Sequence, residues 1–473
     1  MLENIPEERV PSSEDQAMEQ WYLKTITREK TGRYVVELPK IPRYEERLGD
    51  SMQGAIKRFA TIERRLNRDN NLKQQYHEFM EEYLRLGHMT EVSTVDKVKA
   101  EGVSYYLPHH AVLKQASTTT KCRVVFDASH RTSTGTSLND ILLNGPQFQD
   151  DIVSILLRFR MRRVGVVADV EKMYRQILVV PADKRLHRIL WRKEGSEEVS
   201  IFQLNTITYS TACAPYLAIR TLRKIFEDHE ESHPRAMCWY NDFYVDDLLS
   251  GGDTAEEVKQ IQGQLCGMLA AAGFRLRKWA SNDASALRDV PMEDLAIGEE
   301  ANIDGADVGL ALGLVWKTNF DSFSIRVPHI DTSKPITKRN VLSNLAKMYD
   351  PLGFLDPIKM KGKLLMQTLW SLKNPNGQTW SWDAELPETI QEEYRIVSGK
   401  FKHLESICIP RHPKLNSNWQ YHIFCDASER GYGACVYIRS SSTTEGVNIS
   451  ILIVNPEPEV IRPRDPNLLS PDL

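Results

Sequence analysis

Residues 237–252, MCWYNDFYVDDLLSGG, place two adjacent aspartates, Asp246 and Asp247, between two apolar runs. The runs Met237–Val245 and Leu248–Leu249 indicate β-strands, so the two aspartates fall in a hairpin turn. Adjacent carboxylates repel each other, and burying either one alone is costly. A divalent cation removes that cost, since Mg²⁺ takes one or two carboxylates together with substrate phosphates. A polar turn without function is the alternative, and an isolated Asp-Asp pair would favour it.

A third carboxylate ends another strand-like run. Val164–Ala168 is apolar and leads directly into Asp169, for which a strand cap is the simplest alternative role. Together, Asp169, Asp246 and Asp247 could hold two metal ions ~3.5–4 Å apart, the arrangement used for in-line nucleotidyl transfer. Such a site would lower the pKa of a primer 3′-hydroxyl and neutralise a triphosphate and its leaving pyrophosphate.

Two motifs carry a family resemblance. YVDD at 244–247 and VVADVEKMYRQI at 166–177 resemble the catalytic hairpin and the first catalytic strand of reverse transcriptases. The amino-acid sequences of these motifs are similar to those of the BEL/Pao class of long-terminal-repeat retrotransposons. The resemblance implies that the three aspartates bind two Mg²⁺ ions, with Mn²⁺ as the alternative. It also implies an RNA or DNA template with a primer, and deoxynucleoside triphosphates, as partners.

The resemblance also assigns residues around the sugar of the nucleotide. Tyr174 lies five residues after Asp169, where the family places an aromatic ring that blocks a ribose 2′-hydroxyl. This ring would favour deoxynucleotides, because the 2′-hydroxyl is the group that distinguishes the two sugars. A core aromatic is the alternative for Tyr174. Tyr244, in the hairpin motif, is a further substrate-binding residue.

The segment KCRVVFD at 121–127 resembles the strand that holds the incoming triphosphate. Arg123 is the best match for the phosphate clamp, because a guanidinium group binds phosphate through two hydrogen bonds. Lys121 is a second candidate and Lys114 a weaker one. The alternative is a strand with alternating surface charges.

Residues 209–215, YSTACAP, resemble the start of a helix near the template base and the nucleotide. Pro215 suits the first turn of a helix. This sequence has Tyr209-Ser210 where the family has Phe-Gly, and Ala214 where it has serine. If the family's glycine accepts a backbone shape unfavourable to serine, activity would suffer.

Two further segments follow in the family's order. GFRLRKW at 273–279 resembles the segment whose lysine lies near the pyrophosphate, so the resemblance makes Lys278 a general acid. Residues 312–316, LGLVW, resemble a hairpin that grips the primer end.

The region after the polymerase motifs also resembles Pao-type polyproteins. Residues 336–370 are similar to a block typical of that class, often labelled a Pao retrotransposon peptidase, and their lysines could follow a nucleic-acid backbone. Since no Asp-Thr-Gly or Asp-Ser-Gly occurs, we expect no protease activity. Residues 424–428 and 433–437 resemble the first strands of ribonuclease H, with Asp426 as a first metal ligand. Because the chain ends at Leu473, we expect a remnant without ribonuclease H activity.

The amino-acid composition restricts the class of protein less narrowly than the motifs do. The chain has 473 residues, 41% hydrophobic and 26% charged, with a formal charge of −4, as in an ordinary globular protein of two to four domains. Seven cysteines without a CxxC pair, no signal peptide and no membrane span predict an intracellular protein, cytoplasmic and particle-associated or nuclear. Arg158, Arg160, Arg162 and Arg163 form a basic cluster that is either a nucleic-acid contact or a solvated face.

The pattern of elements predicts an α+β fold. We expect polar, turn-forming residues at 1–50, helices at 51–87 and at 334–405, and strands at His422–Cys425 and Gly433–Arg439. A helix should begin at a capping box formed by Thr254 and Glu257 and end at Gly273. Residues 320–333 should form a strand and a linker, and residues 456–473 an irregular tail.

The resemblance implies a right-hand polymerase with fingers, palm and thumb/connection, whose palm is an antiparallel sheet backed by helices, plus a partial ribonuclease H-like α/β fragment. The predicted divisions are a linker and helical segment at 1–104, fingers and palm at 105–318, thumb/connection at 319–415, and the ribonuclease H-like fragment at 416–473.

Three functions remain open. The first is an active RNA-directed DNA polymerase. The second is an inactive nucleic-acid-binding remnant of a decayed or host-retained element, which the missing protease and integrase motifs favour. The third is a viral RNA-dependent RNA polymerase, against which Tyr174 argues.

Overall fold

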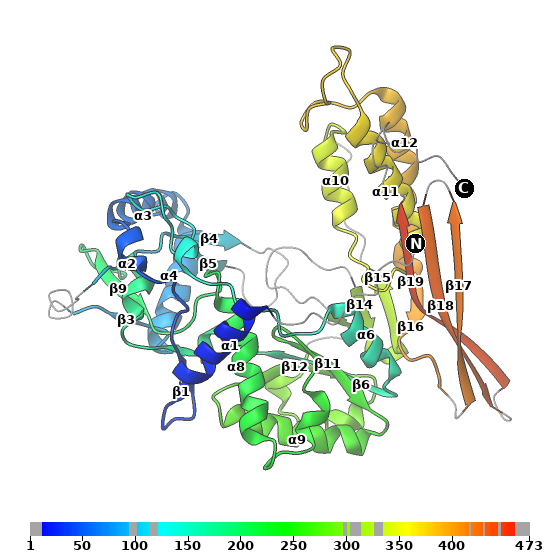
Figure 1. Cartoon of the computed structure of the whole chain (residues 1–473), viewed down its shortest axis with the longest axis horizontal. Helices are drawn as coiled ribbons and strands as arrows, with labels where there is room; N and C mark the ends of the chain where they lie inside the picture. Colours follow the sequence, from blue (N-terminus) through cyan, green and yellow to red (C-terminus); the bar gives the residue numbers. More distant parts are fainter. Residues whose placement is uncertain are drawn as a thin grey trace. The chain divides into compact units, whose positions relative to one another are not determined.

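The computed structural model describes residues 12–93, 102–113, 122–296, 300–302, 314–325, 334–415, 418–428, 431–442 and 446–458. The chain forms two compact units (Figure 1). The first comprises Met1–Gln149, Val170–Tyr240 and Ile261–Leu276. The second comprises Asp150–Asp169, Asn241–Gln260 and Arg277–Leu473.

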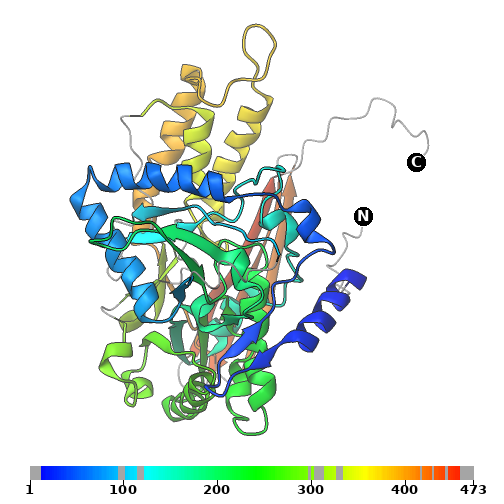
Figure 2. The same ribbon diagram turned by 90° about the vertical axis from the view of Figure 1, so that its left-hand side faces the viewer.

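The helices of the first unit confirm one prediction and correct another. In the described part of this unit, the helices include α1 (Ser13–Thr25), α2 (Tyr44–Arg47), α3 (Met52–Leu66), α4 (Asn70–Arg85), α7 (Met173–Gln176) and α8 (Ala214–His229). As predicted for residues 51–87, α3 and α4 follow one another and are visible as two consecutive helices in Figure 2. Helix α1 was not predicted, although Ser12 and Asp15 form a capping box at its start.

The strands of the first unit form three small sheets. One has the order β1-β2-β7 (Thr27–Arg28, Tyr34–Val36, Leu178–Val179), and another the order β3-β9-β8 (Met89–Glu91, Ser200–Leu204, Arg188–Trp191). The third pairs β4 (His109–Leu113) with β5 (Cys122–Phe126).

The second unit contains nearly all of a four-stranded sheet of order β10-β11-β6-β12. Its strands are β10 (Phe243–Tyr244), β11 (Asp247–Gly252), β6 (Val164–Val170) and β12 (Leu276–Ser281). Helix α6 (Ile152–Met161) packs on this sheet. The strand predicted at Val164–Ala168 is confirmed. The strand predicted at Met237–Val245 is wrong for most of its length, because Ala236–Trp239 form a 3₁₀ turn that buries Trp239 completely. A short buried apolar run has no periodicity to separate the two outcomes.

Helix α9 (Ala255–Ala270) begins and ends where the sequence predicts. The Thr254 hydroxyl accepts a hydrogen bond from the Glu257 amide at 3.2 Å. The Glu257 carboxylate accepts the amide of Asp253, one residue earlier than the predicted capping box requires. Gly273 has a φ of 80°, which suits the end of a helix.

A second sheet of this unit has the order β13-β14-β15-β16 (Glu300–Asn302, Leu314–Lys317, Ser322–Ile325, Cys408–Pro410). The predicted strand of residues 320–333 is therefore present as β15, while 326–333 lie outside the described residues. Residues of this sheet and of α6 share one core, which includes Leu156, Phe159 and Trp316.

Among its described residues, the second unit also contains three α-helices and three long strands. Helices α10 (Lys338–Ala346), α11 (Asp356–Ser371) and α12 (Glu388–Ser398) run side by side (Figure 1) around a core of their own, as the prediction for 334–405 requires. Strands β17 (Asn418–Ser428), β18 (Gly431–Ser442) and β19 (Gly446–Pro458) form an antiparallel sheet. The predicted irregular tail is wrong for 456–458, which belong to β19, and 459–473 lie outside the described residues.

Short 3₁₀ segments complete the chain at Asn139–Ile141, Lys184–His187, Ala236–Trp239, Ala284–Leu287, Met292–Asp294, Thr318–Phe320 and Phe401–Ser406. Among the described residues, none of the helices has the length and apolar character needed to cross a membrane.

Candidate active site

Two of the three predicted catalytic aspartates lie opposite each other on neighbouring strands. Asp247 begins β11, and its backbone partner in the antiparallel register with β6 is Asp169. Directly opposed residues have Cα atoms ~4.5–5.5 Å apart, so both carboxylates lie at the same end of the sheet. Tyr244 pairs with Asp247 across the hairpin, which leaves Val245 and Asp246 as the two-residue turn. The predicted hairpin is therefore present.

The turn holds an unusual backbone conformation. Val245 has a φ of 54°, in the left-handed region that β-branched residues rarely adopt. Tight two-residue hairpins need a positive φ at the first turn position, which glycine usually provides. A valine there stores strain of ~1–3 kcal/mol, and such strain persists where the surrounding structure fixes it, most often at functional sites.

Lys278 lies beside this carboxylate pair. Its Nζ is 3.1 Å from Oδ2 of Asp169, with the lysine side chain 55% exposed and the aspartate 22% exposed. The ammonium group offsets part of the repulsion between Asp169 and Asp247. Lys278 also has a positive φ, of 56°. The sequence-predicted residues Asp169, Asp246, Asp247, Lys278 and Tyr244 thus come together at one end of this sheet.

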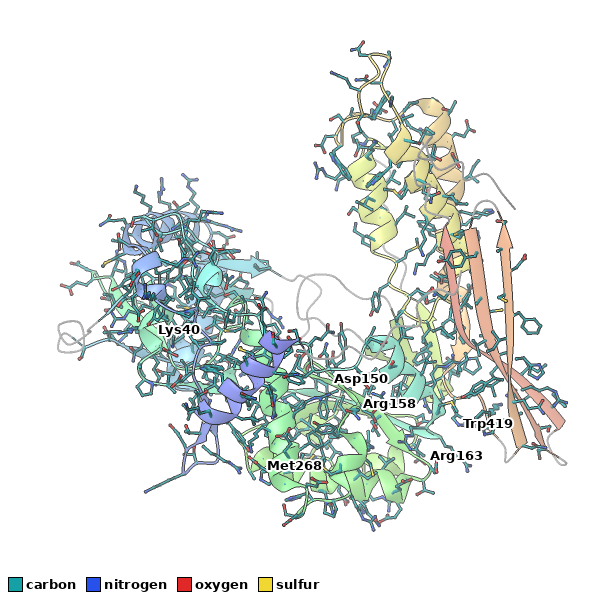
Figure 3. The ribbon with its side chains drawn as sticks, viewed as in Figure 1. Lys40, Asp150, Arg158, Arg163, Met268 and Trp419 are labelled. Atoms are coloured by element: carbon teal, nitrogen blue, oxygen red, sulfur yellow. The ribbon has the colours of Figure 1, made fainter. Side chains whose placement is uncertain are left out.

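A network of polar side chains joins the hairpin to α6. Asp242, just before β10, is buried and accepts a hydrogen bond from the Ser250 hydroxyl on β11. Arg158 on α6 donates to Asp242 and to Asp150 at 2.8 Å each, and Figure 3 labels Asp150 and Arg158. Although burial acts against its charge, these bonds raise the pKa of the Arg158 guanidinium. The sequence offered Arg158 only as part of a basic cluster.

Arg160, from the same cluster, is not available to nucleic acid. It is fully buried on α6, and its guanidinium donates to the backbone carbonyls of Pro410, Arg411, Ile451 and Leu452. Burial, with a smaller contribution from the charge of Arg411, lowers the pKa of Arg160 to about 10. A solvated or nucleic-acid-binding role for this residue is therefore wrong, because its donors are used inside the protein.

The described residues contain no group of three or more His, Cys, Asp or Glu side chains gathered closely enough to hold a metal ion by themselves. Mg²⁺ in nucleotide-binding sites usually takes one or two carboxylates and completes its shell with substrate phosphates and water. The opposed pair Asp169 and Asp247 meets that smaller requirement, and Asp246 follows directly in the turn.

The predicted nucleotide-binding residues lie in the first unit. Arg123 is half-buried in β5, and the carbonyl of its neighbour Val124 accepts a hydrogen bond from the Tyr209 hydroxyl. The Tyr209 ring meets the Tyr174 ring edge-on, with centroids 6.5 Å apart. Tyr209 thus links the strand of Arg123 to Tyr174, a role that sequence reasoning missed. Lys121 and Lys114 lie outside the described residues.

The segment before α8 contains the predicted Pro215 and the serine, Ser210, that stands where the family has glycine. Pro215 occupies the first turn of α8, as predicted. The hydroxyl of Ser210 is buried without a hydrogen-bond partner among the described residues. Asn139 holds the segment through the Ser210 carbonyl at 3.2 Å and the Ala212 amide at 2.8 Å. The backbone of Ser210 does not have a positive φ, so this position does not need the glycine that the family has there.

Asp426 lies apart from these residues in β17. It pairs with Gly433 in the sheet register, and its carboxylate accepts the amide of Ala427 at 2.9 Å. This strand is exposed along almost its whole length.

Comparisons with known proteins agree with this architecture. Residues 337–456 match the family described as "Pao retrotransposon-like RNaseH-like domain". A search of curated proteins by sequence returns no match. The foamy viral protease-reverse transcriptase dRH in complex with ds DNA is similar in structure, with a TM-score of 0.50 and 12% identity over 80% of this chain and 54% of that chain. The foamy viral protease-reverse transcriptase with an RNA/DNA hybrid has a TM-score of 0.49 and 12% identity, over 81% of this chain and 42% of that chain.

The mixed α/β fold of the chain is therefore similar to that of the foamy viral protease-reverse transcriptase dRH. The chain spans about half the length of the solved structures it matches. The match to the Pao-type family model at 337–456 covers less than half of the chain. The matched domain spans residues on both sides of the division that the sequence analysis places after residue 415.

Proposed function

We propose that the chain is an RNA-directed DNA polymerase that transfers a nucleotide from a deoxynucleoside triphosphate to a primer 3′-hydroxyl. The observation that carries this proposal is the cross-strand pair Asp169–Asp247 beside a strained hairpin turn that contains Asp246. Two facing carboxylates at the end of a sheet, with a third next in the chain, suit phosphoryl transfer, which depends on positioning and charge stabilisation.

The roles of the residues follow from this geometry. Asp169, Asp246 and Asp247 would hold two Mg²⁺ ions, which supply charge neutralisation and a more acidic 3′-hydroxyl when bound. Asp242 and Arg158 join the hairpin to α6, because Asp242 accepts hydrogen bonds both from Ser250 on β11 and from Arg158 on α6. Lys278, 3.1 Å from Asp169, would leave that carboxylate to donate a proton toward the pyrophosphate.

The right-hand description extends the proposal to the elements. Strands β10, β11, β6 and β12 with α6 and α9 would form the palm, β4 and β5 with α3 and α4 the fingers, and α10–α12 the thumb/connection. In the fingers, Arg123 would bind the triphosphate and Tyr174 would contact the sugar. Strands β17–β19 would belong to the ribonuclease H-like part, with Asp426 as a first metal ligand of its site.

Extension of a DNA primer on an RNA template tests the proposal. With Mg²⁺, the parent should add deoxynucleotides, and chelation by EDTA should stop it. Asp169→Asn keeps the side-chain shape but removes the charge, so extension should fall at least 100-fold. Asp228→Asn is a matched control, since Asp228 belongs to the first unit and accepts a hydrogen bond from Tyr34 there, whereas Asp169 belongs to the second unit. A folded parent that binds primer–template but never extends it would favour the inactive-remnant alternative.

A further inference from the structure

Helix α3 of the first unit carries its basic residues on one side. Two pairs of them are seven positions apart in the chain, Lys57 with Arg64 and Arg58 with Arg65. The members of each pair therefore lie on nearly the same line of the helix, ~10.5 Å apart at the usual rise per residue. All four residues are exposed, and so is Arg68 in the turn after α3. These five residues form the α3 basic stripe.

Most of the positive charge of the α3 basic stripe is not neutralised by the protein. Arg58 lies 3.6 Å from the carboxylate of Asp127, and its side chain is still 61% exposed. Within the described part of the chain, the other four residues of the stripe form no ion pair with a carboxylate. The acidic residue of α3, Glu63, is bound to Arg192 at 2.7 Å. The stripe therefore offers exposed cations to an acidic partner.

The remaining surface of α3 limits what the stripe can bind. Phe59 and Leu66 are only 6% and 5% exposed, on the side where α3 packs on β8 and β4. A helix that binds a membrane surface inserts its own apolar face, and that face of α3 is already covered by protein. The core of a protein interface is apolar and poor in charged residues, whereas the other side chain of α3 within the stripe is Thr61. Neither a membrane nor an apolar protein surface fits these residues.

The phosphates of a nucleic acid match the stripe. A guanidinium group binds phosphate through two parallel hydrogen bonds, and exposed arginines and lysines neutralise the backbone whatever its sequence. Proteins that hold an unpaired strand add aromatic side chains on which its bases stack, and the α3 basic stripe contains none. A duplex turns its bases inward and presents its phosphates on both strands, so cations alone can hold it.

We propose that the α3 basic stripe binds the phosphates of a nucleic-acid duplex. The stripe borders the candidate nucleotide-binding strand, because Asp127, the partner of Arg58, directly follows β5, which carries Arg123. The inference deepens the proposed polymerase function and rests on it, since the duplex is the primer–template that such an enzyme extends. The binding step itself requires neither Mg²⁺ nor the three catalytic aspartates.

Binding of a fluorescently labelled blunt DNA duplex to the full chain, measured by anisotropy at several salt concentrations without Mg²⁺ or nucleotides, tests this proposal. In the Arg64→Gln, Arg65→Gln protein, the slope of log affinity against log salt should fall by ~1.8, the value for two phosphates of B-form DNA. The Arg64→Lys, Arg65→Lys protein keeps both charges and should keep the slope. The matched control is Lys24→Gln, Lys30→Gln, which removes the same charge from exposed residues on α1 and after β1 and should leave the slope unchanged.

Three results would overturn the proposal. One is a salt slope of the Arg64→Gln, Arg65→Gln protein that equals the slope of the lysine control. Another is a fall of the same size with unpaired oligo(dT), which would assign the stripe to a single strand. The third is a loss of binding by the Arg64→Lys, Arg65→Lys protein as large as that of the glutamine variant, since its charges are intact. The Asp246→Ala, Asp247→Ala protein should bind the duplex with the slope of the parent, so failed primer extension would not alter the outcome.

Discussion

At the residue scale, a few side chains with specific contacts define the candidate site. Asp169 faces Asp247 across two strands, Lys278 lies against Asp169, and Tyr209 joins the strand of Arg123 to Tyr174. The buried arginines show the limit of reading charge from sequence, since Arg160 is as basic as its neighbours but is enclosed by backbone carbonyls.

Tyr174 should determine the choice of sugar. Tyr174→Ala removes the ring that would meet a ribose 2′-hydroxyl, so ribonucleotide incorporation should rise at least tenfold relative to deoxynucleotide incorporation. Tyr174→Phe keeps the ring and should stay selective. The ratio of kcat/KM for a dNTP and its rNTP measures the effect, and an unchanged ratio in the alanine variant would remove Tyr174 from this role.

Tyr209 should act through its hydroxyl group. Tyr209→Phe leaves the Val124 carbonyl without its partner, at a cost of ~1–3 kcal/mol, and should raise the KM for dNTP more than it lowers kcat. Tyr22→Phe removes a comparable buried bond, 2.9 Å long, to Thr221. If both variants lose equal stability and change KM equally, the Tyr209 bond has no special link to the nucleotide.

At the element scale, the loop that enters α11 should make stability depend on pH. Burial is the main cause that raises the pKa of Asp356, in the first turn of α11, to about 6, and it also raises the pKa of Asp350. Because Asp356 binds its proton more tightly in the folded state, its contribution to stability falls as pH rises from ~4 to 6.

Asp356→Asn should therefore be more stabilising at pH 7 than at pH 4, by on the order of 1–2 kcal/mol. Urea unfolding of parent and variant at both pH values measures the difference. The opposite sign would show that the ion pair of Asp356 with Lys359, at 3.4 Å, outweighs burial.

The elements also show what the sequence could predict. Helices α3 and α4 and strand β6 were predictable, because their apolar residues repeat at the spacing of one buried face or run unbroken into Asp169. The hairpin was predicted from two carboxylates between apolar runs. Its turn lies at Val245 and Asp246, one residue before the predicted Asp246 and Asp247, although valine does not favour positive φ. Residues 237–242 were predicted wrongly, because local pattern does not show that Trp239 is buried by distant residues. The links of Tyr209 and Arg158 join segments far apart in the chain, so spacing gave no signal for them.

At the scale of the whole molecule, the second unit is joined by a buried ion pair. Arg411, just after β16, is completely buried and binds Asp321 at 2.6 and 2.9 Å. It also donates to the carbonyls of Phe159, Arg162 and Arg163, at the junction of α6 and β6. Arg411, inside the match to the Pao-type domain, thus shares one network with residues that precede the match.

Arg411→Met should reduce the free energy of unfolding of the chain by about 3–5 kcal/mol, because it leaves Asp321 and three carbonyls without their donor. In the double variant with Asp321→Asn, the loss should be smaller than the sum of the two single losses by at least ~0.5 kcal/mol. Additive losses in urea unfolding would mean that the pair does not act as a unit.

Polymerase activity is tested most directly by Mg²⁺-dependent extension of a DNA primer on an RNA template, with the parent and with the Asp246→Ala, Asp247→Ala protein. Both proteins should fold and bind primer–template. We expect extension by the parent and none by the variant, because the hairpin carboxylates would be needed to hold the metal ions. Equal extension by both proteins, or none by a folded and binding-competent parent, would contradict it.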